Sequence, residues 1–99
     1  MSEGEKIDTA ATELGVSREL LAEMYAAGGS LESIVLGCKR LLRNSREADP
    51  EREIRAALRE VREPSSAAEA ASRAMLLFGR HAQVMVLVAR SVGRDKVAP

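Results

Sequence analysis

The chain has 99 residues, of which 45% are hydrophobic and only 2% are aromatic. This length suits one domain around a single core, and the hydrophobic content excludes wholesale disorder. Fifteen Lys and Arg residues balance fifteen Asp and Glu residues, so no net field draws the chain to nucleic acid or to an anionic membrane.

The charges are nevertheless unevenly distributed along the chain. Residues 1–30 contain six acidic and two basic groups, a net charge of −4, whereas residues 64–99 contain five basic and two acidic groups, a net charge of +3. Residues 31–63 are nearly balanced, with eight basic and seven acidic groups. An acidic beginning and a basic end favour contacts between proteins over contacts with a phosphate backbone.

Local signals divide the chain into helices. Each expected helix begins at a residue whose side chain can cap it: Ser2, Ser17, Ser30, Asp49 and Ser66. The helices stop at residues that leave or cannot continue a helix: Gly15, the Gly28-Gly29 pair, Asn44, Pro64 and Gly93. Glu5 and Glu69 complete the spacing of a capping box with Ser2 and Ser66. Pro50 directly after Asp49 strengthens the fourth start.

The last segment, residues 66–92, is the longest expected helix, and Gly79 either kinks it or divides it in two. Residues 83–92 are rich in β-branched side chains, which favour a strand by propensity. Nothing else alternates with period two, so a strand there has no partner and we favour a helix. Its apolar residues occupy all sides, as in a central helix or a dimer seam. We therefore expect an all-α, compact bundle of five or six short helices with a long apolar C-terminal helix.

Residues 1–93 are expected to form a single helical domain, and residues 94–99 a flexible C-terminal tail. Cys38 is the only cysteine, so no intrachain disulfide forms, which fits a reducing compartment. The acidic N-terminus does not resemble a secretory signal. The longest apolar run, residues 84–89, is far shorter than the roughly 18 residues that span a bilayer. We therefore expect a cytoplasmic protein.

Residues 7–27 have the pattern of two helices joined by a tight turn. Ala11 is small enough to let two helices cross, and Gly15 permits the turn. Apolar residues would lock the pair together: Ala10, Leu14, Val16, Leu21 and Met24. This segment resembles the helix-turn-helix of bacterial repressors and excisionase-type proteins. The resemblance implies that the helix after Ser17 enters the major groove of DNA.

The charge of that second helix argues against DNA. The resemblance places the base-reading positions at Ser17, Arg18, Glu19, Ala22 and Glu23. A glutamate can accept from cytosine, but two glutamates in an acidic third of the chain repel the phosphates on which such binding depends. We favour tight helix packing without DNA. A helix-turn-helix DNA-binding transcriptional regulator is the alternative.

The same region also resembles a ubiquitin-associated three-helix domain. That family's first loop matches Leu14-Gly15-Val16, its second loop matches Gly28-Gly29, and its late leucine pair matches Leu41-Leu42. Val16 stands where the family has an aromatic residue, which weakens the expected apolar contact patch. By helix count and charge segregation alone, the chain is analogous to six-helix death-fold adaptors, which bind through opposed acidic and basic faces.

Four arginines recur at spacings of three, four and three: Arg52, Arg55, Arg59 and Arg62. On a helix they fall within an arc of about 80°. One reading is a solvated face, in which they pair with Glu51, Glu60 and Glu63. The other is a docking patch for an acidic protein surface, which Lys39, Arg40, Arg43 and Arg46 of the preceding helix would extend. No aromatic residues interleave to stack bases, so RNA or DNA is less favoured.

His81 is the only histidine, and neither it nor Cys38 has the partners that a reactive site needs. One histidine and one cysteine cannot build a zinc site. A Cys38–His81 dyad would lack an orienting group and an oxyanion hole. We expect a boundary or core histidine, a core cysteine, no metal ion, no cofactor and no enzymatic activity.

The sequence therefore predicts a non-enzymatic protein-protein interaction or regulatory module. Its segregated acidic and arginine-rich faces would bind a protein partner, a second copy, or both; nucleic acid is less favoured and no membrane is expected. The expected partner-binding residues are Glu13, Glu19, Glu23, Arg52, Arg55, Arg59 and Arg62.

Overall fold

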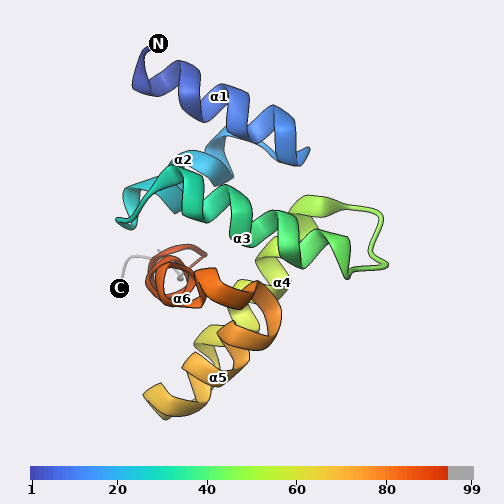
Figure 1. The fold of residues 1–99 in the computed structure, drawn as a ribbon, viewed down its shortest axis with the longest axis vertical. Helices are drawn as coiled ribbons and strands as arrows, with labels where there is room; N and C mark the ends of the chain where they lie inside the picture. Colours follow the sequence, from blue (N-terminus) through green and yellow to red (C-terminus); the bar gives the residue numbers. More distant parts are fainter. Residues whose placement is uncertain (94–99) are drawn as a thin grey trace, which may run out of the picture.

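The computed structural model describes residues 1–93, which form helices and turns without any β-strand (Figure 1). The helices are α1 (Glu3–Leu14), α2 (Arg18–Ala26), α3 (Leu31–Arg43), α4 (Pro50–Arg62), α5 (Ala67–Phe78) and α6 (Ala82–Ser91), and a short 3-10 turn, η1 (Gly79–His81), joins the last two. The expected all-α bundle is confirmed, and so is the helical state of most of residues 83–92. Residues 94–99, expected to be a tail, lie outside the described residues.

The caps form where the sequence predicts them. The Ser2 hydroxyl accepts from the Glu5 N–H, and the Glu5 carboxylate accepts from the Ser2 N–H, which makes a complete capping box. The side chains of the other four expected caps also accept from helix N–H groups: Ser17, Ser30, Asp49 and Ser66. At Ser66 the expected capping box is only half formed, since the Glu69 carboxylate pairs with Arg73 instead.

The long C-terminal helix is not confirmed: of the two outcomes expected at Gly79, a kink or a division, the chain divides there into α5 and α6. This glycine has φ +62° and ψ −134°, a conformation that residues with a Cβ atom rarely adopt. The helical hydrogen bonding is interrupted there, and α6 turns back to pack against α5. Figure 1 shows α6 nearly end-on beside α5.

Helix α6 is the centre of the bundle. It contacts α2, α3, α4 and α5, and it buries Met85, Val88 and Ala89 completely. Phe78 is the only buried aromatic side chain in the core of residues 1–93. Helix α1, by contrast, packs mainly on α2 and α3 at one end of the molecule (Figure 1). Within residues 1–93, no helix has the length and apolar character that crossing a membrane requires.

Candidate protein-interaction surface

The turn between α1 and α2 packs tightly and lies against α4. Gly15 has φ +76°, and its N–H donates to the Ala11 carbonyl at 2.9 Å. Ala11 and Leu14 are buried. The backbone N–H of Ser17 donates to Oε1 of Glu51 at 2.8 Å. The turn is therefore attached to the first turn of α4, although the two segments are far apart in sequence.

Helix α2 turns its apolar residues inward and its carboxylates outward. Leu20, Leu21 and Met24 have no solvent exposure. Arg18, the only cation of this helix, pairs with Asp8 of α1, with 2.6 Å between Nε and Oδ1. Glu19 is exposed. The surface of α2 thus carries negative charge, while its cation is already engaged.

The three predicted acidic site residues do not form one free acidic face. Glu13 pairs with Lys39 of α3. The Glu23 carboxylate accepts from the Gly93 N–H at 3.4 Å. Glu19 is exposed and forms no ion pair within residues 1–93. The chain's own basic and backbone groups therefore engage part of the acidic charge, and Glu19 is the one most available to a partner.

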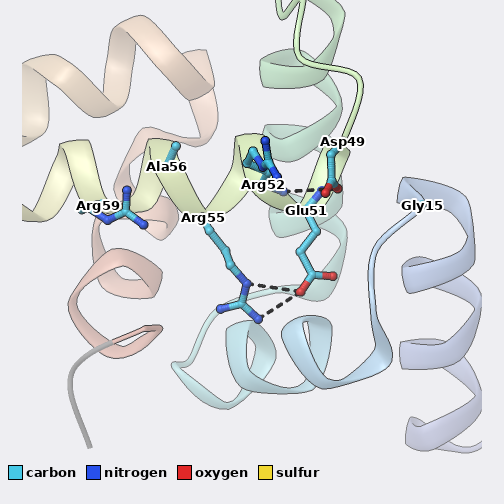
Figure 2. Close-up of a pocket in the computed structure, with 7 residues that line it drawn as sticks. All are labelled: Gly15, Asp49, Glu51, Arg52, Arg55, Ala56 and Arg59. Atoms are coloured by element: carbon cyan, nitrogen blue, oxygen red, sulfur yellow. Dashed lines mark hydrogen bonds and ion pairs between the residues drawn. The ribbon is translucent and has the colours of Figure 1, made fainter.

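Three of the four predicted arginines line a concavity of about 470 Å³ beside α4 (Figure 2). We call Arg52, Arg55 and Arg59 the arginine surface. The concavity is also lined by Gly15, Asp49, Glu51 and Ala56. It lies where the N-terminal half of α4 meets the turn between α1 and α2. A smaller concavity of about 150 Å³ also contains Arg55 and Arg59 and extends to Val92 and Gly93.

The members of the arginine surface differ in how strongly they are held. Arg55 is half-buried, and its Nε and Nη2 lie 3.2 and 3.1 Å from Oε2 of Glu51. Figure 2 shows these two side chains reaching toward each other. Arg52 and Arg59 are exposed, and neither forms an ion pair within the described residues. Two guanidinium groups therefore remain available beside one that is positioned by a carboxylate.

Arg62 forms hydrogen bonds within the fold that the spacing of the four arginines did not predict. Its Nη1 donates to the carbonyl of Ala89 at 3.1 Å and to that of Val92 at 2.6 Å. These are carbonyls at the C-terminal end of α6, where a cation is favourable. Of the ion pairs considered for a solvated arginine face, only Arg55 with Glu51 forms within residues 1–93; those with Glu60 and Glu63 do not.

Glu51 contributes more to this surface than its place in the sequence pattern predicted. One of its oxygens accepts from Ser17 and the other from Arg55. The hydrogen bond from the Ser17 backbone is the main reason that the pKa of Glu51 is lowered, and Arg55 lowers it further. The pairing with Arg55 was readable from the i, i+4 spacing. The contact with Ser17 was not, because it depends on how α1 and α2 pack against α4.

Cys38 lacks the exposure and the acidity of a reactive thiol. Cys38 has no solvent exposure, and burial raises the pKa of its thiol to about 12, which disfavours the nucleophilic thiolate. His81 is half-buried in η1. In the part of the chain that the structure describes, no three side chains of His, Cys, Asp or Glu are grouped so that they could hold a metal ion.

Comparisons of the chain with protein-family models, with curated proteins and with solved structures find no match. The function proposed below therefore rests on the residues and their geometry.

Proposed function

We propose that the chain is a non-enzymatic protein-interaction module that binds an acidic protein surface through the arginine surface. One observation carries this proposal: exposed Arg52 and Arg59 flank Arg55 around a concavity, and neither has an ion pair within residues 1–93. A guanidinium offers a planar fork of donors that matches a carboxylate. A partner's Asp or Glu side chains would supply the missing acceptors.

The composition of the concavity favours a protein partner over a nucleic acid. Its wall includes the carboxylates of Asp49 and Glu51, and the neighbouring α2 exposes Glu19. A duplex brings continuous phosphate charge, which these groups would repel. A protein surface can place single carboxylates opposite arginines and leave the acidic wall uncontacted.

The lining of the same concavity favours binding over catalysis. It consists of arginines, carboxylates, glycine and alanine, without a hydroxyl, thiol or imidazole side chain, and the Glu51 carboxylate already accepts from Ser17 and Arg55. This supports a role as an adaptor or regulatory module. The acidic partner would be another protein or the Glu19 region of a second copy, and the mass of the complex distinguishes the two.

The direct test reverses the two exposed arginines. Partners recovered with the tagged chain from its native host would be identified, purified and titrated against wild-type protein and the Arg52→Glu/Arg59→Glu variant. We expect the variant to lose at least about a hundredfold in affinity, because two attractive charge pairs become repulsive. Binding of the wild type should also weaken between about 0.05 and 0.5 M salt as exposed charges are screened.

A matched control carries the same change in net charge elsewhere. Arg43 and Arg46 are exposed and do not line the concavity. The Arg43→Glu/Arg46→Glu variant should bind nearly as well as the wild type. Equal losses in both variants would reduce the effect to net charge and contradict a specific arginine surface.

DNA binding is the competing outcome. If the wild type retained duplex DNA at low salt in a gel-shift experiment, and Arg18→Glu abolished the retention, the second helix would be a DNA-reading element. That result would overturn the protein-interaction proposal.

A further inference from the structure

Another concavity, about 570 Å³, runs between α5 and α6 and shares no residue with the arginine surface. We call it the α5–α6 groove. Ala67, Ala71 and Met75 line it from α5, and Val86 and Leu87 line it from α6. The small alanines leave room between the two helices, so a third helix could approach the groove closely.

Large apolar side chains are exposed at this groove. Met75 is 62% exposed and Leu87 is 45% exposed, and Leu76, next to Met75 on α5, is 80% exposed. Single exposed apolar residues are normal on a protein surface, but Met75 and Leu87 line the same groove from two adjacent helices and form an apolar patch there. Such patches commonly mark interaction sites.

The charge at the groove is positive. Arg80 and Arg90 line it, and they stand before and near the end of α6. The groove lining contains no acidic residue. Neither arginine forms an ion pair within residues 1–93. At 1.5 Å per residue, the helical stretch from Ala82 to Arg90 rises about 12 Å, and Arg80 precedes it in η1, so the two cations are spaced to flank roughly two turns of a bound helix.

We propose that the α5–α6 groove binds an amphipathic helix of a partner protein, with an apolar stripe flanked by carboxylates. The stripe would pack on Met75, Val86 and Leu87, in the manner of helix-in-groove recognition. The flanking carboxylates would pair with Arg80 and Arg90. This site is independent of the arginine surface and adds a second contact of different chemistry.

A second copy of the chain fits the groove less well than such a partner. A symmetric pairing would bring Arg80 and Arg90 against the same cations of the other copy, and the groove offers no acid to balance them. The acidic helices α1 and α2 expose no large apolar side chain. Leu36 of α3 is exposed, but Lys39 and Arg40 follow it at helical spacing.

The probe for this proposal is a displayed library of helical peptides of about 18 residues, selected against the full chain. We expect enrichment of sequences with Leu, Ile, Met or Phe at i, i+4 and i+7 and with Asp or Glu on both flanks. The best peptide would then be synthesised with its acids intact and with each acid replaced by Lys. Fluorescence anisotropy would measure both, and the Lys peptide should bind at least about tenfold more weakly.

Variants of the chain locate the binding. The Leu87→Ser variant and the Arg80→Glu/Arg90→Glu variant should each bind the acidic peptide at least tenfold more weakly than the wild type. A tenfold change in affinity corresponds to roughly 1.4 kcal/mol. Leu36→Ser is the matched control, since Leu36 is exposed to a similar extent, 42%, on another helix; it should leave binding unchanged. Circular dichroism would verify that each variant is folded.

Four outcomes would overturn the proposal: no enrichment, enrichment of neutral or basic peptides, unchanged binding by Leu87→Ser, or a wild-type dimer that Leu87→Ser dissociates. The last would make the groove a self-association seam. Arg52→Glu/Arg59→Glu should bind the peptide normally, so failure at the arginine surface and failure at the groove are distinguishable.

Discussion

The Ser17 N–H and the Glu51 carboxylate are joined by a 2.8 Å hydrogen bond across 34 positions of sequence. This contact attaches the start of α2 to the first turn of α4. The other oxygen of Glu51 lies 3.1 Å from Nη2 of Arg55. A single carboxylate therefore connects the α1–α2 turn to the arginine surface and holds its central guanidinium in place.

Replacing Glu51 should destabilise the fold in a pH-dependent way. Its pKa is lowered from 4.5, chiefly by the Ser17 N–H. A carboxyl with a depressed folded pKa stabilises the fold above its unfolded pKa, and that stabilisation is lost as the pH falls through the folded value. We expect Glu51→Ala to lower the free energy of unfolding by about 1.5 kcal/mol at neutral pH, and by less below about pH 4.

Urea denaturation at several pH values measures this difference. Glu60→Ala is the control, because Glu60 lies exposed on the same helix; its effect should stay within about 0.5 kcal/mol. If the loss of unfolding free energy in Glu51→Ala were the same at neutral and at acidic pH, the ionised carboxylate would not have the role given to it.

The two glycines between α2 and α3 should differ sharply in their tolerance of alanine. Both have positive φ, +100° at Gly28 and +118° at Gly29, so alanine strains either site by roughly 1 kcal/mol. A Cβ at Gly28 would meet open space, whereas one at Gly29 would overlap the side chain of Val84. We expect Gly29→Ala to cost at least about 1 kcal/mol more than Gly28→Ala.

Thermal unfolding of the two variants gives the comparison directly. Adding Val84→Ala should recover part of the loss in the Gly29→Ala background, because it removes the overlapping methyl groups. Equal melting temperatures for the two single variants would show that α6 yields at this point and that the overlap has no energetic consequence.

The helix boundaries were predictable because caps and stops act within a few residues. Ser2, Ser17, Ser30 and Asp49 begin helices through hydrogen bonds to N–H groups two or three positions ahead. Gly79 was harder, because a glycine in a helical pattern can be tolerated, kinked or used as a break. The Arg40 side chain of α3 packs where a Cβ of Gly79 would lie, and no local pattern indicates this tertiary contact.

The arginine surface was predictable only in part, for the same reason. The spacing of Arg52, Arg55 and Arg59 places them on one face of α4, as predicted from helical periodicity. The concavity also needs Gly15, which reaches α4 through the packing of α1 and α2. Arg62 shares the periodicity, but its guanidinium serves α6 carbonyls 27 and 30 positions away.

Replacing Arg62 should lower the free energy of unfolding much more than replacing Arg59. Arg62→Met keeps much of the side-chain volume but loses both hydrogen bonds to the C-terminal carbonyls of α6. We expect a loss of about 2 kcal/mol in the free energy of unfolding, together with faster amide exchange in α6. Arg59→Met should change stability by no more than about 0.5 kcal/mol, because Arg59 is exposed without an ion pair in residues 1–93.

Urea unfolding and hydrogen exchange of these two variants separate structure from binding. If Arg62→Met were as stable as Arg59→Met, the bonds to Ala89 and Val92 would contribute nothing to the fold. Arg62 would then belong with the arginine surface in binding experiments. If the expected difference in stability is found, a change at Arg62 would affect folding as well as binding. Arg52 and Arg59 are therefore the positions at which binding alone can be tested.

The buried thiol of Cys38 should make the fold sensitive to high pH and resistant to thiol reagents. Burial raises its pKa from 9.0 to about 12, so the thiol stays neutral in the fold while the unfolded chain ionises first. Wild-type protein should therefore lose stability relative to Cys38→Ala as the pH rises from 9 toward 12. Below pH 9 the difference between the two should be constant and should reflect packing alone.

Native protein at about pH 8 should react with a disulfide reagent at least about a thousandfold more slowly than urea-unfolded protein, since labelling must wait for opening of the core. The absorbance of the released thiolate follows both reactions. If the native protein were labelled as fast as the unfolded protein, α3 would open freely at Cys38. The pH dependence of stability expected from the buried thiol would then be absent as well.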